Sequence, residues 1–243
     1  MKIKAIKTRI FLPNESLRLF VDQHIKAIKD GDILVITSKI AALSEGRFVA
    51  KWDKAKKQKI IRQESEIMIP AKHICLTVKD GMVMASAGID ESNGNGLLIF
   101  LPRDSWKIAS VLRRYFMTKY QLKHLGVIIT DSRNAPFRAG ASGVAIAYSG
   151  FKGLKDYRKT VDIFGRSFHS SRVDVADSLA SAAVLCMGEG NEKKPLAIIS
   201  NPPVEYISKV NRQELRVRIE EDMYAPLFQA VNSRNFNSGK TTY

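Results

Sequence analysis

The sequence predicts an α+β protein, because strand-like and helix-like segments are mixed without the regular alternation of a βαβ fold. Short apolar runs bounded by glycine, proline or polar residues are typical of strands, and they occur at 33–38, 97–102, 125–132, 141–150 and 195–200. No repeat with a period of about 20 to 50 residues is present. Neither GxGxxG nor GxxxxGK followed by Ser or Thr occurs, so a nucleotide would be bound without a Rossmann turn or a P-loop.

The N-terminal third contains one predicted helix, one strand and a lysine-rich stretch. Asn14 or Ser16 can cap the helix, and "DGD" at 30–32 ends it. Its apolar residues follow helical spacing: Leu17, Phe20, Val21, Ile25 and Ile28. The strand "ILVITS" follows, and we interpret the lysine-rich stretch 51–62 as a solvated face or a loop.

The middle of the chain is predicted to hold a β-hairpin, two strands and a helix. The hairpin lies within 72–88 and turns at Asp80-Gly81, a dipeptide typical of two-residue turns. The strand at 97–102 precedes a helix that Asp104 or Ser105 can cap. The apolar residues of this helix share one face: Ile108, Leu112 and Phe116. The buried strand "LGVIITDS" at 125–132 then ends in an acid.

The C-terminal part begins with the glycine-bounded strand at 141–150. A helix at 175–188 is rich in small residues, so we expect it to pack closely against a neighbour. The short strand at 195–200 follows it. Residues 210–231 are predicted to form a helix interrupted near Pro226, and residues 232–243 a frayed tail.

The composition indicates a globular protein with a strong positive charge. Lys and Arg number 39 against 24 Asp and Glu, a formal net charge of +15, which favours nucleotides, nucleic acids or polyanionic substrates as partners. The basic residues are scattered and no RNP-like motif is present, so we do not favour nucleic acid among these.

Two further classes are not favoured by the sequence. No uncharged apolar run reaches the ~18 residues of a membrane span, and no signal peptide is recognisable, so we expect a cytoplasmic protein without a membrane partner. Cys75 and Cys186 lie far apart without metal-binding spacing, and both are expected to be small buried side chains.

Two acids stand where predicted strands stop, and they are candidate metal ligands. Asp90 follows the hairpin, and Asp131 ends its strand with the hydroxyl of Ser132 beside it. Mg²⁺ and Mn²⁺ prefer such oxygen donors, completed by water and phosphate oxygens. The alternative is that Asp90 organises a turn and Asp131 caps an element. Glu189, after the last predicted helix, is either a further ligand or a solvated side chain.

Two other groups are candidate anion-binding residues. Ser38 and Lys39 stand at another strand end, where a hydroxyl and an ammonium could bind phosphate, although a lysine there could also be plain surface. In residues 155–168, two acids and two arginines either pair internally or bind an acidic substrate. These four residues are Asp156, Asp162, Arg158 and Arg166.

The ordered set of motifs resembles the coenzyme F-420-0:L-glutamate ligase family, also called gamma-glutamyl ligases. The matching segments are "GDILVITSK" with "SEGR", "AGIDESN", "LLIFLPRD", "VIITDS" with "PFR", "GVAIAYSG", "DYR" with "VDIFGRSF", and "VADSLASAAVLCMGE". Together they cover most of residues 9–200.

The resemblance implies a fold and a set of ligands. The fold would have two domains, an outer one of residues 1–78 and 190–243 and a central one of residues 79–189, in an intertwined homodimer. The ligands would be GTP and two Mg²⁺ or Mn²⁺ ions. Asp90 and Asp131 would bind the first ion, Ser132 and Glu189 the second, and Arg138 would join the two aspartates in catalysis. The nucleotide would contact the loop 187–194 and these residues: Leu12, Pro13, Ser38, Lys39, Asn93, Met187 and Gly188.

The activity that the resemblance implies is the addition of L-glutamate to an anionic carboxylate acceptor through an acyl phosphate made with GTP. F-420-0 or a similar acceptor is favoured, with tetrahydrofolate second. The same fold could instead serve a non-catalytic protein that binds nucleotides or nucleic acids. The same site could also serve a metal-dependent phosphatase or nucleotide hydrolase.

Three departures from the family pattern border the expected cleft. Leu43 stands where a lysine is usual, residues 133–135 ("RNA") replace a glycine-containing turn, and Lys159 replaces a small residue.

Overall fold

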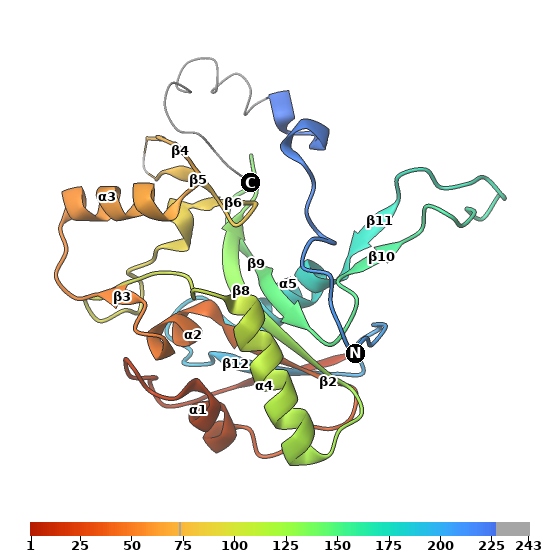
Figure 1. Cartoon of the computed structure of the whole chain (residues 1–243), viewed down its shortest axis with the longest axis horizontal. Coiled ribbons are helices and arrows are strands. Elements are labelled where there is room, and N and C mark those ends of the chain that lie inside the picture. The colour runs from red at the N-terminus through yellow and green to blue at the C-terminus, as the bar shows by residue number, and fades with distance from the viewer. Residues whose placement is uncertain (73, 227–243) are drawn as a thin grey trace.

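A mixed five-stranded sheet forms the centre of the protein in a computed structural model that describes residues 1–72 and 74–226 (Figure 1). Its strands lie in the order β1-β12-β2-β8-β9. Their bounds are Lys2–Ile6 for β1, Asp32–Thr37 for β2, Leu125–Asn134 for β8, Ala141–Ser149 for β9 and Leu196–Ser200 for β12. Within this sheet only β2 and β8 pair in parallel, and Thr37, the last residue of β2, lies opposite Thr130, after which β8 continues to Asn134. The helices and strands confirm a mixed α and β structure.

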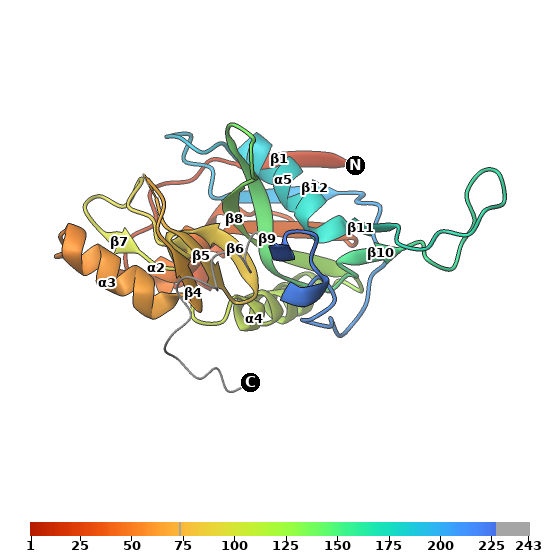
Figure 2. The same ribbon diagram turned by 90° about the horizontal axis from the view of Figure 1, so that it is seen from above.

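Helices cover both faces of this sheet, as Figure 2 shows for α4 and α5. The larger core cluster joins one face to α1 (Leu17–His24), α2 (Ser38–Ser44) and α4 (Ser105–Tyr120). The second cluster joins the other face to α5 (Val175–Met187). Because alternate residues of a strand point to opposite faces, Leu34 and Ile36 enter the first cluster while Ile33 and Val35 enter the second.

The close packing predicted for the small-residue helix is confirmed. A Cβ atom on Gly143 of β9 would come within 2.7 Å of the carbonyl oxygen of Ala180 and of Val184 in α5. The hydroxyl of Ser181 donates a hydrogen bond to the Gly143 carbonyl at 2.6 Å. Helix α5 is therefore held against β9 by both packing and a hydrogen bond.

A smaller sheet of three strands contains the predicted hairpin. It consists of β4 (Ile67–Ile69), β5 (Leu76–Lys79) and β6 (Met82–Ala85), and β5 and β6 are joined at Asp80-Gly81, as expected. Both turn residues have positive φ angles, 51° and 71°, as a two-residue turn of this type requires. The short helix η1 (Ser86–Gly88) follows and leads directly to Asp90.

Two short strand pairs complete the described sheets. One joins β3 (Phe48–Val49) to β7 (Leu98–Ile99), so the strand expected at 97–102 is much shorter than predicted. The other joins β10 (Leu154–Asp156) to β11 (Arg172–Asp174) at the base of a long hairpin that projects from the body of the molecule (Figure 1).

The first two helical expectations are corrected in part. Helix α1 ends at His24, and the chain becomes extended at Ile25, yet Ile25 and Ile28 remain buried in the main core. The lysine-rich stretch forms the helix α3 (Lys54–Glu64), whose N-cap Asp53 accepts a hydrogen bond from the backbone of Lys56. Of the two alternatives expected for this stretch, the loop was wrong. The solvated face is confirmed, since Ile61 is the one buried residue of α3.

The helix predicted for 210–231 is absent from residues 210–224, and only Ala225 and Pro226, the last described residues, are α-helical. That segment contains turns and the short helix η2 (Ile219–Glu221). The carboxylate of Glu214 instead accepts hydrogen bonds from the hydroxyl of Tyr148 at 2.5 Å and from the backbone of Gly153 at 2.8 Å, and these contacts anchor the segment without a helix. Residues 227–231 and the expected tail lie outside the described residues.

The two cysteines differ in exposure. Cys75 is buried as expected, but Cys186 is exposed on α5, which corrects the expectation of a buried side chain there. None of the helices in the described residues is long and apolar enough to cross a membrane.

Candidate active site

The parallel pairing of β2 and β8 brings the first two candidate groups together. Thr37, the last residue of β2, is the register partner of Thr130, so Ser38, which begins α2, lies beside Asp131. The expectation that Asp131 ends its strand was wrong, because β8 continues to Asn134 and Asp131 pairs with Val144 of β9. The hydroxyl of Ser38 donates a hydrogen bond to Oδ1 of Asp131 at 3.2 Å. Residues 93 positions apart in the sequence thus meet because β2 ends beside Thr130, the residue before Asp131 in β8.

Asp131 has a strongly perturbed pKa. Part of the residue is open to solvent, but dense protein surroundings raise the pKa of its carboxyl to about 6. The backbone N–H of Ser132 and the hydroxyl of Ser38 act in the opposite direction. The charge of Asp90 raises this pKa as well, while that of Lys39 lowers it, so all three charged groups belong to one electrostatic cluster.

Asp90 is held by the two residues that surround its carboxylate. The backbone N–H of Ser92 donates to Oδ1 at 2.8 Å, and the Ser92 hydroxyl donates to Oδ2 at 2.6 Å. The ammonium of Lys39 also donates to Oδ2, at 2.7 Å. Burial acts to raise the pKa of Asp90, but these hydrogen bonds outweigh burial and leave it below its ordinary value.

The prediction that Asp90 organises a turn is confirmed, because its carboxylate accepts a hydrogen bond from the backbone N–H of Ser92, two residues later. Ser92 was missed by sequence reasoning, although the Asp-x-Ser spacing is a signal for such a turn.

Two further hydrogen bonds connect the loop after α5 to β8 and to the loop after η1. Ser132 follows Asp131 in the strand, and its hydroxyl donates to Oε1 of Glu189 at 2.6 Å. The side-chain amide of Asn93 donates to the carbonyl oxygen of Gly190 at 2.9 Å. The loop after η1 and the loop after α5 are thus joined to each other and to β8.

The chemistry of these donors fits a hard divalent cation. All four predicted ligands present oxygen, and the carboxylate of Asp90 already pairs with a cation, the Lys39 ammonium. Within the described residues, no group of three or more His, Cys, Asp or Glu side chains could hold a metal ion. The oxygen donors present fit Mg²⁺ or Mn²⁺, which take one or two protein carboxylates together with water and phosphate oxygens.

Comparison with known proteins identifies the family to which this arrangement belongs. Residues 5–201 match the family described as F420-0:Gamma-glutamyl ligase. The chain belongs to the F420-0:gamma-glutamyl ligase family. The resemblance of the motifs is thereby confirmed.

Several curated relatives match the chain over most of its length. The coenzyme F420:L-glutamate ligase of Methanococcus maripaludis strain C7 is 34% identical over 242 residues, which cover 92% of this chain and 97% of the relative. That of Methanocaldococcus jannaschii is 36% identical over 245 residues, covering 92% and 96%. That of Methanothermobacter thermautotrophicus is 36% identical over 193 residues, covering 72% and 76%.

The other residues that the F420-0:gamma-glutamyl ligase resemblance assigns to the nucleotide lie around this cluster in different settings. Leu12 and Pro13 are exposed in a loop that is bonded to the end of α2 through the backbone N–H of Asn14 and the carbonyl of Leu43. Met187 is buried in the second core cluster, so only its backbone can reach a ligand. Gly188 ends α5 with a φ angle of 84°.

Arg138 is not brought into contact with the two aspartates. It lies in the exposed loop between β8 and β9, and its side chain has no hydrogen-bond or ion-pair partner in the described part of the chain. A catalytic role for Arg138 stays a prediction.

The three departures from the F420-0:gamma-glutamyl ligase pattern now have structural settings. Leu43 is 7% exposed and belongs to the main core, so its side chain packs where a lysine was expected. Arg133 forms an ion pair with Asp177 of α5 at 3.2 Å. Lys159 is exposed on the projecting hairpin.

On the same hairpin, the acids have structural roles. Asp156 pairs with Arg158 at 2.6 Å, which confirms internal pairing for these two residues. Oδ1 of Asp162 accepts hydrogen bonds from the backbone N–H groups of Phe164 and Arg166, at 2.8 and 2.9 Å. The Asp162 carboxylate thus shapes the turn, and its contact to Arg166 involves the backbone of that residue.

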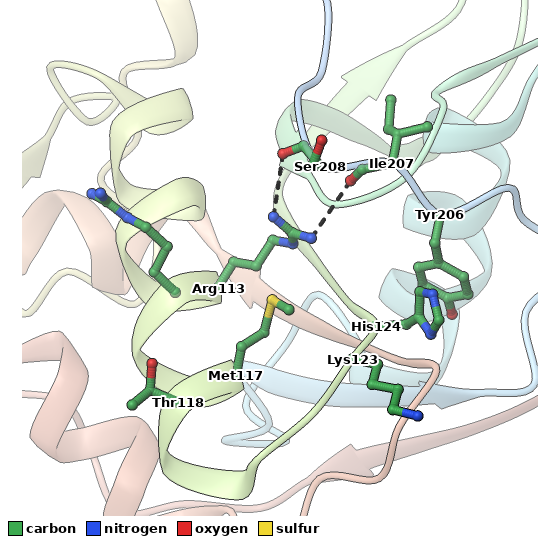
Figure 3. Close-up of a pocket in the computed structure, with 9 residues that line it drawn as sticks. Arg113, Met117, Thr118, Lys123, His124, Tyr206, Ile207 and Ser208 are labelled. Carbon is green, nitrogen blue, oxygen red and sulfur yellow. Dashed lines mark hydrogen bonds between the residues drawn. The ribbon is translucent and has the colours of Figure 1, made fainter.

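A cavity of about 580 Å³ between α4 and residues 206–208 contains none of the predicted site residues (Figure 3). Arg113 reaches across it and donates to the carbonyl oxygens of Leu125, Ser208 and Ile207 at 2.8, 3.3 and 3.5 Å. Because these backbone groups engage its guanidinium, Arg113 fastens the C-terminal segment to α4 and β8.

Proposed function

We propose that this chain is a GTP- and divalent-metal-dependent gamma-glutamyl ligase that adds L-glutamate to coenzyme F420-0 or a similar carboxylate acceptor. Family membership supports the amide-bond-forming reaction. The observation that carries the proposal is the convergence of Asp90 and Asp131 with two hydroxyls and the Lys39 ammonium beside β8. Such a cluster of oxygen donors with one cation can hold a metal–nucleotide complex.

The proposed reaction has two steps whose atoms balance. An oxygen of the acceptor carboxylate attacks the terminal phosphorus of GTP, the bond to the bridging oxygen breaks, and GDP leaves. The amine of glutamate then attacks the carbonyl carbon of the acyl phosphate, inorganic phosphate leaves, and the nitrogen loses a proton. Activation is needed because a free carboxylate does not react with an amine, and no covalent enzyme nucleophile is required.

The chain's own residues would divide this work. Asp90 and Asp131 would hold one ion, and Ser132 with Glu189 a second; bound divalent ions supply charge neutralisation for a phosphoryl group. Asn93 ties its loop to Gly190, which orders two segments expected to contact GTP.

The Ser38 hydroxyl fixes the rotamer of Asp131, so that carboxylate is positioned before ligands arrive. Positioning in advance matters because only correctly placed groups lower the barrier to phosphoryl transfer.

We also propose that the ligase is a homodimer. Besides the family resemblance, the tip of the projecting hairpin supports this, because Ile163 and Phe164 are 92% and 80% exposed. Burying such side chains against a second copy would remove apolar surface from water. Light scattering on the purified protein should give twice the mass of the chain, and a monomer at micromolar concentration would contradict it.

The function is tested by incubating purified protein with GTP, Mn²⁺, glutamate and either F420-0 or tetrahydrofolate. We expect phosphate release that requires both glutamate and acceptor, and a product heavier by one glutamyl residue. Turnover with tetrahydrofolate alone would support a folate ligase, and phosphate release without acceptor would indicate a hydrolase.

A further comparison separates the ligase from a non-catalytic binding protein. The protein is titrated with generic RNA and DNA at increasing salt. Absence of turnover together with micromolar, steeply salt-dependent binding would favour the binding protein and reject the ligase.

A further inference from the structure

The ammonium of Lys39 lies against the carboxylate of Asp90, a predicted metal ligand. Its nitrogen lies 2.7 Å from Oδ2 of Asp90, 2.5 Å from the carbonyl oxygen of Ser92 and 3.1 Å from the Ser92 hydroxyl. A lysine ammonium has three donors, and these contacts engage all of them. The carboxylate in turn accepts three hydrogen bonds from Lys39 and Ser92.

The two partners of this ion pair differ in their freedom to move. The backbone of Asp90 is fixed by two hydrogen bonds with Ile99, at 2.9 and 2.8 Å. Lys39 is the second residue of α2, and the next two residues, Ile40 and Ala41, are buried, but its charge is carried at the end of a flexible four-carbon side chain. Exchange at this site therefore moves the lysine side chain and leaves the aspartate in place.

Electrostatic repulsion means that a divalent cation and the Lys39 ammonium would not share the carboxylate of Asp90. An ammonium and a divalent cation repel each other, and both seek the same oxygen of Asp90. When Lys39 leaves, it carries an unpaired positive charge within reach of the segments that are expected to hold the nucleotide phosphates. Asp131 lies in the same electrostatic cluster, so Lys39 influences both carboxylates.

We propose that Lys39 is an exchangeable counter-ion that couples nucleotide binding to metal binding. It neutralises Asp90 in the ligand-free chain, is displaced when a divalent cation binds, and then pairs with a phosphate of the nucleotide. The inference rests on the proposed function. Because linkage is reciprocal, metal should tighten nucleotide binding by the same factor as nucleotide tightens metal binding, and Lys39 should supply part of that factor.

A neighbouring ion pair provides a matched control. Lys57 of α3 lies 3.2 Å from Glu91, the residue after Asp90, and its side chain is 25% exposed against 26% for Lys39. Replacing either lysine by methionine removes one positive charge that faces the loop of Asp90 and Glu91. Only the Lys39→Met change frees the carboxylate of a predicted metal ligand.

The experiment measures binding, independently of catalysis. Mn²⁺ is titrated by calorimetry into wild-type, Lys39→Met and Lys57→Met proteins, without nucleotide and with a non-hydrolysable GTP analogue. Without nucleotide, we expect Lys39→Met to bind Mn²⁺ several-fold more tightly than wild type. The factor by which the analogue tightens Mn²⁺ binding should be smaller in Lys39→Met than in wild type, by on the order of tenfold. Lys57→Met should change both quantities less than about twofold.

Three outcomes would overturn the proposal: Mn²⁺ affinity that is unchanged or weaker in Lys39→Met, an equal change in Lys57→Met, or no Mn²⁺ binding by the wild type. A Lys39→Gln variant, checked by thermal unfolding, repeats the test if the methionine variant does not fold. If the binding results hold but no acceptor is ligated, the proposed function fails while the counter-ion exchange stands.

Discussion

The acidic cluster beside β8 and the cavity beside α4 show two different uses of polar side chains. At the cluster, carboxylates, hydroxyls and an ammonium from separate segments bind one another through groups that can exchange partners. Beside α4, one guanidinium donates to three backbone carbonyls. The contrast teaches that a cavity is not by itself evidence of a catalytic site. The proposed chemistry belongs instead where carboxylates, hydroxyls and an ammonium from separate segments meet, beside the point at which β2 ends against β8.

The largest expected effect is on activity, from Asp131→Asn. The change keeps the shape of the side chain but removes the charge, and we expect ligase activity to fall by about a hundredfold or more, since loss of a residue that only orients a metal ligand already costs about tenfold to a hundredfold. Asp80→Asn, which removes an equal charge from an exposed hairpin turn, is the control in the same assay. Full activity in Asp131→Asn would contradict the assignment of the acidic cluster as the active site.

The same variant should change the pH dependence of stability in metal-free buffer. The folded pKa of about 6 exceeds the ordinary value of 3.8, so the folded chain holds a proton that the unfolded chain has released. Stability contributed by this group is present below pH 3.8 and is lost as pH rises to about 6, by about 3 kcal/mol at most. Urea unfolding from about pH 4 to about pH 7 should show this loss in wild type and not in Asp131→Asn.

Leu43→Ala tests whether packing of α2 in the core holds Ser38 and Lys39 in place. Leu43 is buried at the end of the helix that starts with Ser38 and Lys39, so truncation should cost about 3 kcal/mol of unfolding free energy and also reduce nucleotide affinity. Leu43→Met, which keeps the volume, should cost less than about 1.5 kcal/mol. Denaturant unfolding and nucleotide titration check the two effects, and unaltered stability in Leu43→Ala would contradict the packing role.

Arg113→Ala should give the opposite phenotype to Asp131→Asn. Loss of the guanidinium leaves carbonyl groups of Leu125, Ile207 and Ser208 without their donor, which should cost about 2 kcal/mol of stability. Activity per folded molecule should stay within about twofold of wild type, as measured by initial rates alongside the folded fraction from circular dichroism. A selective loss of activity would assign chemistry to the cavity.

The smallest effect is expected from Glu64→Gln, in an ion-pair cluster away from both regions. Burial acts to raise the pKa of Glu64, but hydrogen bonds from Lys79 and Arg47, each at 2.8 Å, outweigh it and leave the pKa below 4.5. The group therefore contributes stability above pH 4.5 that is lost as pH falls. Wild type should exceed the variant by about 1 kcal/mol at about pH 7 and by less at about pH 3.

Part of the candidate site could be read from the sequence because its residues follow buried apolar runs, although only Ser38 stands at a strand end and Asp131 lies within β8. The apolar runs before Ser38 and Asp131 predicted two buried strands, and their parallel pairing explains why the following side chains meet. Pairing itself is a long-range property that periodicity does not encode. For the same reason β1 was not predicted: its lysines mask a strand that forms the edge of the sheet.

The errors elsewhere have physical causes as well. The helical spacing at 210–226 was overridden when Glu214 became a partner of Tyr148, a tertiary contact that replaces local hydrogen bonds. The charge of residues 51–62 concealed a helix because only Ile61 needs to be buried to dock it. Lys39 was expected to face a nucleotide, and its contact with Asp90 could not be foreseen because the two residues are distant in sequence.

The alignment of Thr37 with Thr130 has a consequence for how this protein can evolve. A slip of one residue between the two strands would turn every following side chain to the reverse face and part Ser38 from Asp131. Backbone hydrogen bonds that touch no substrate therefore maintain the alignment on which reactivity depends. Substrate preference can drift through the surrounding loops, whereas this seam must be inherited unchanged.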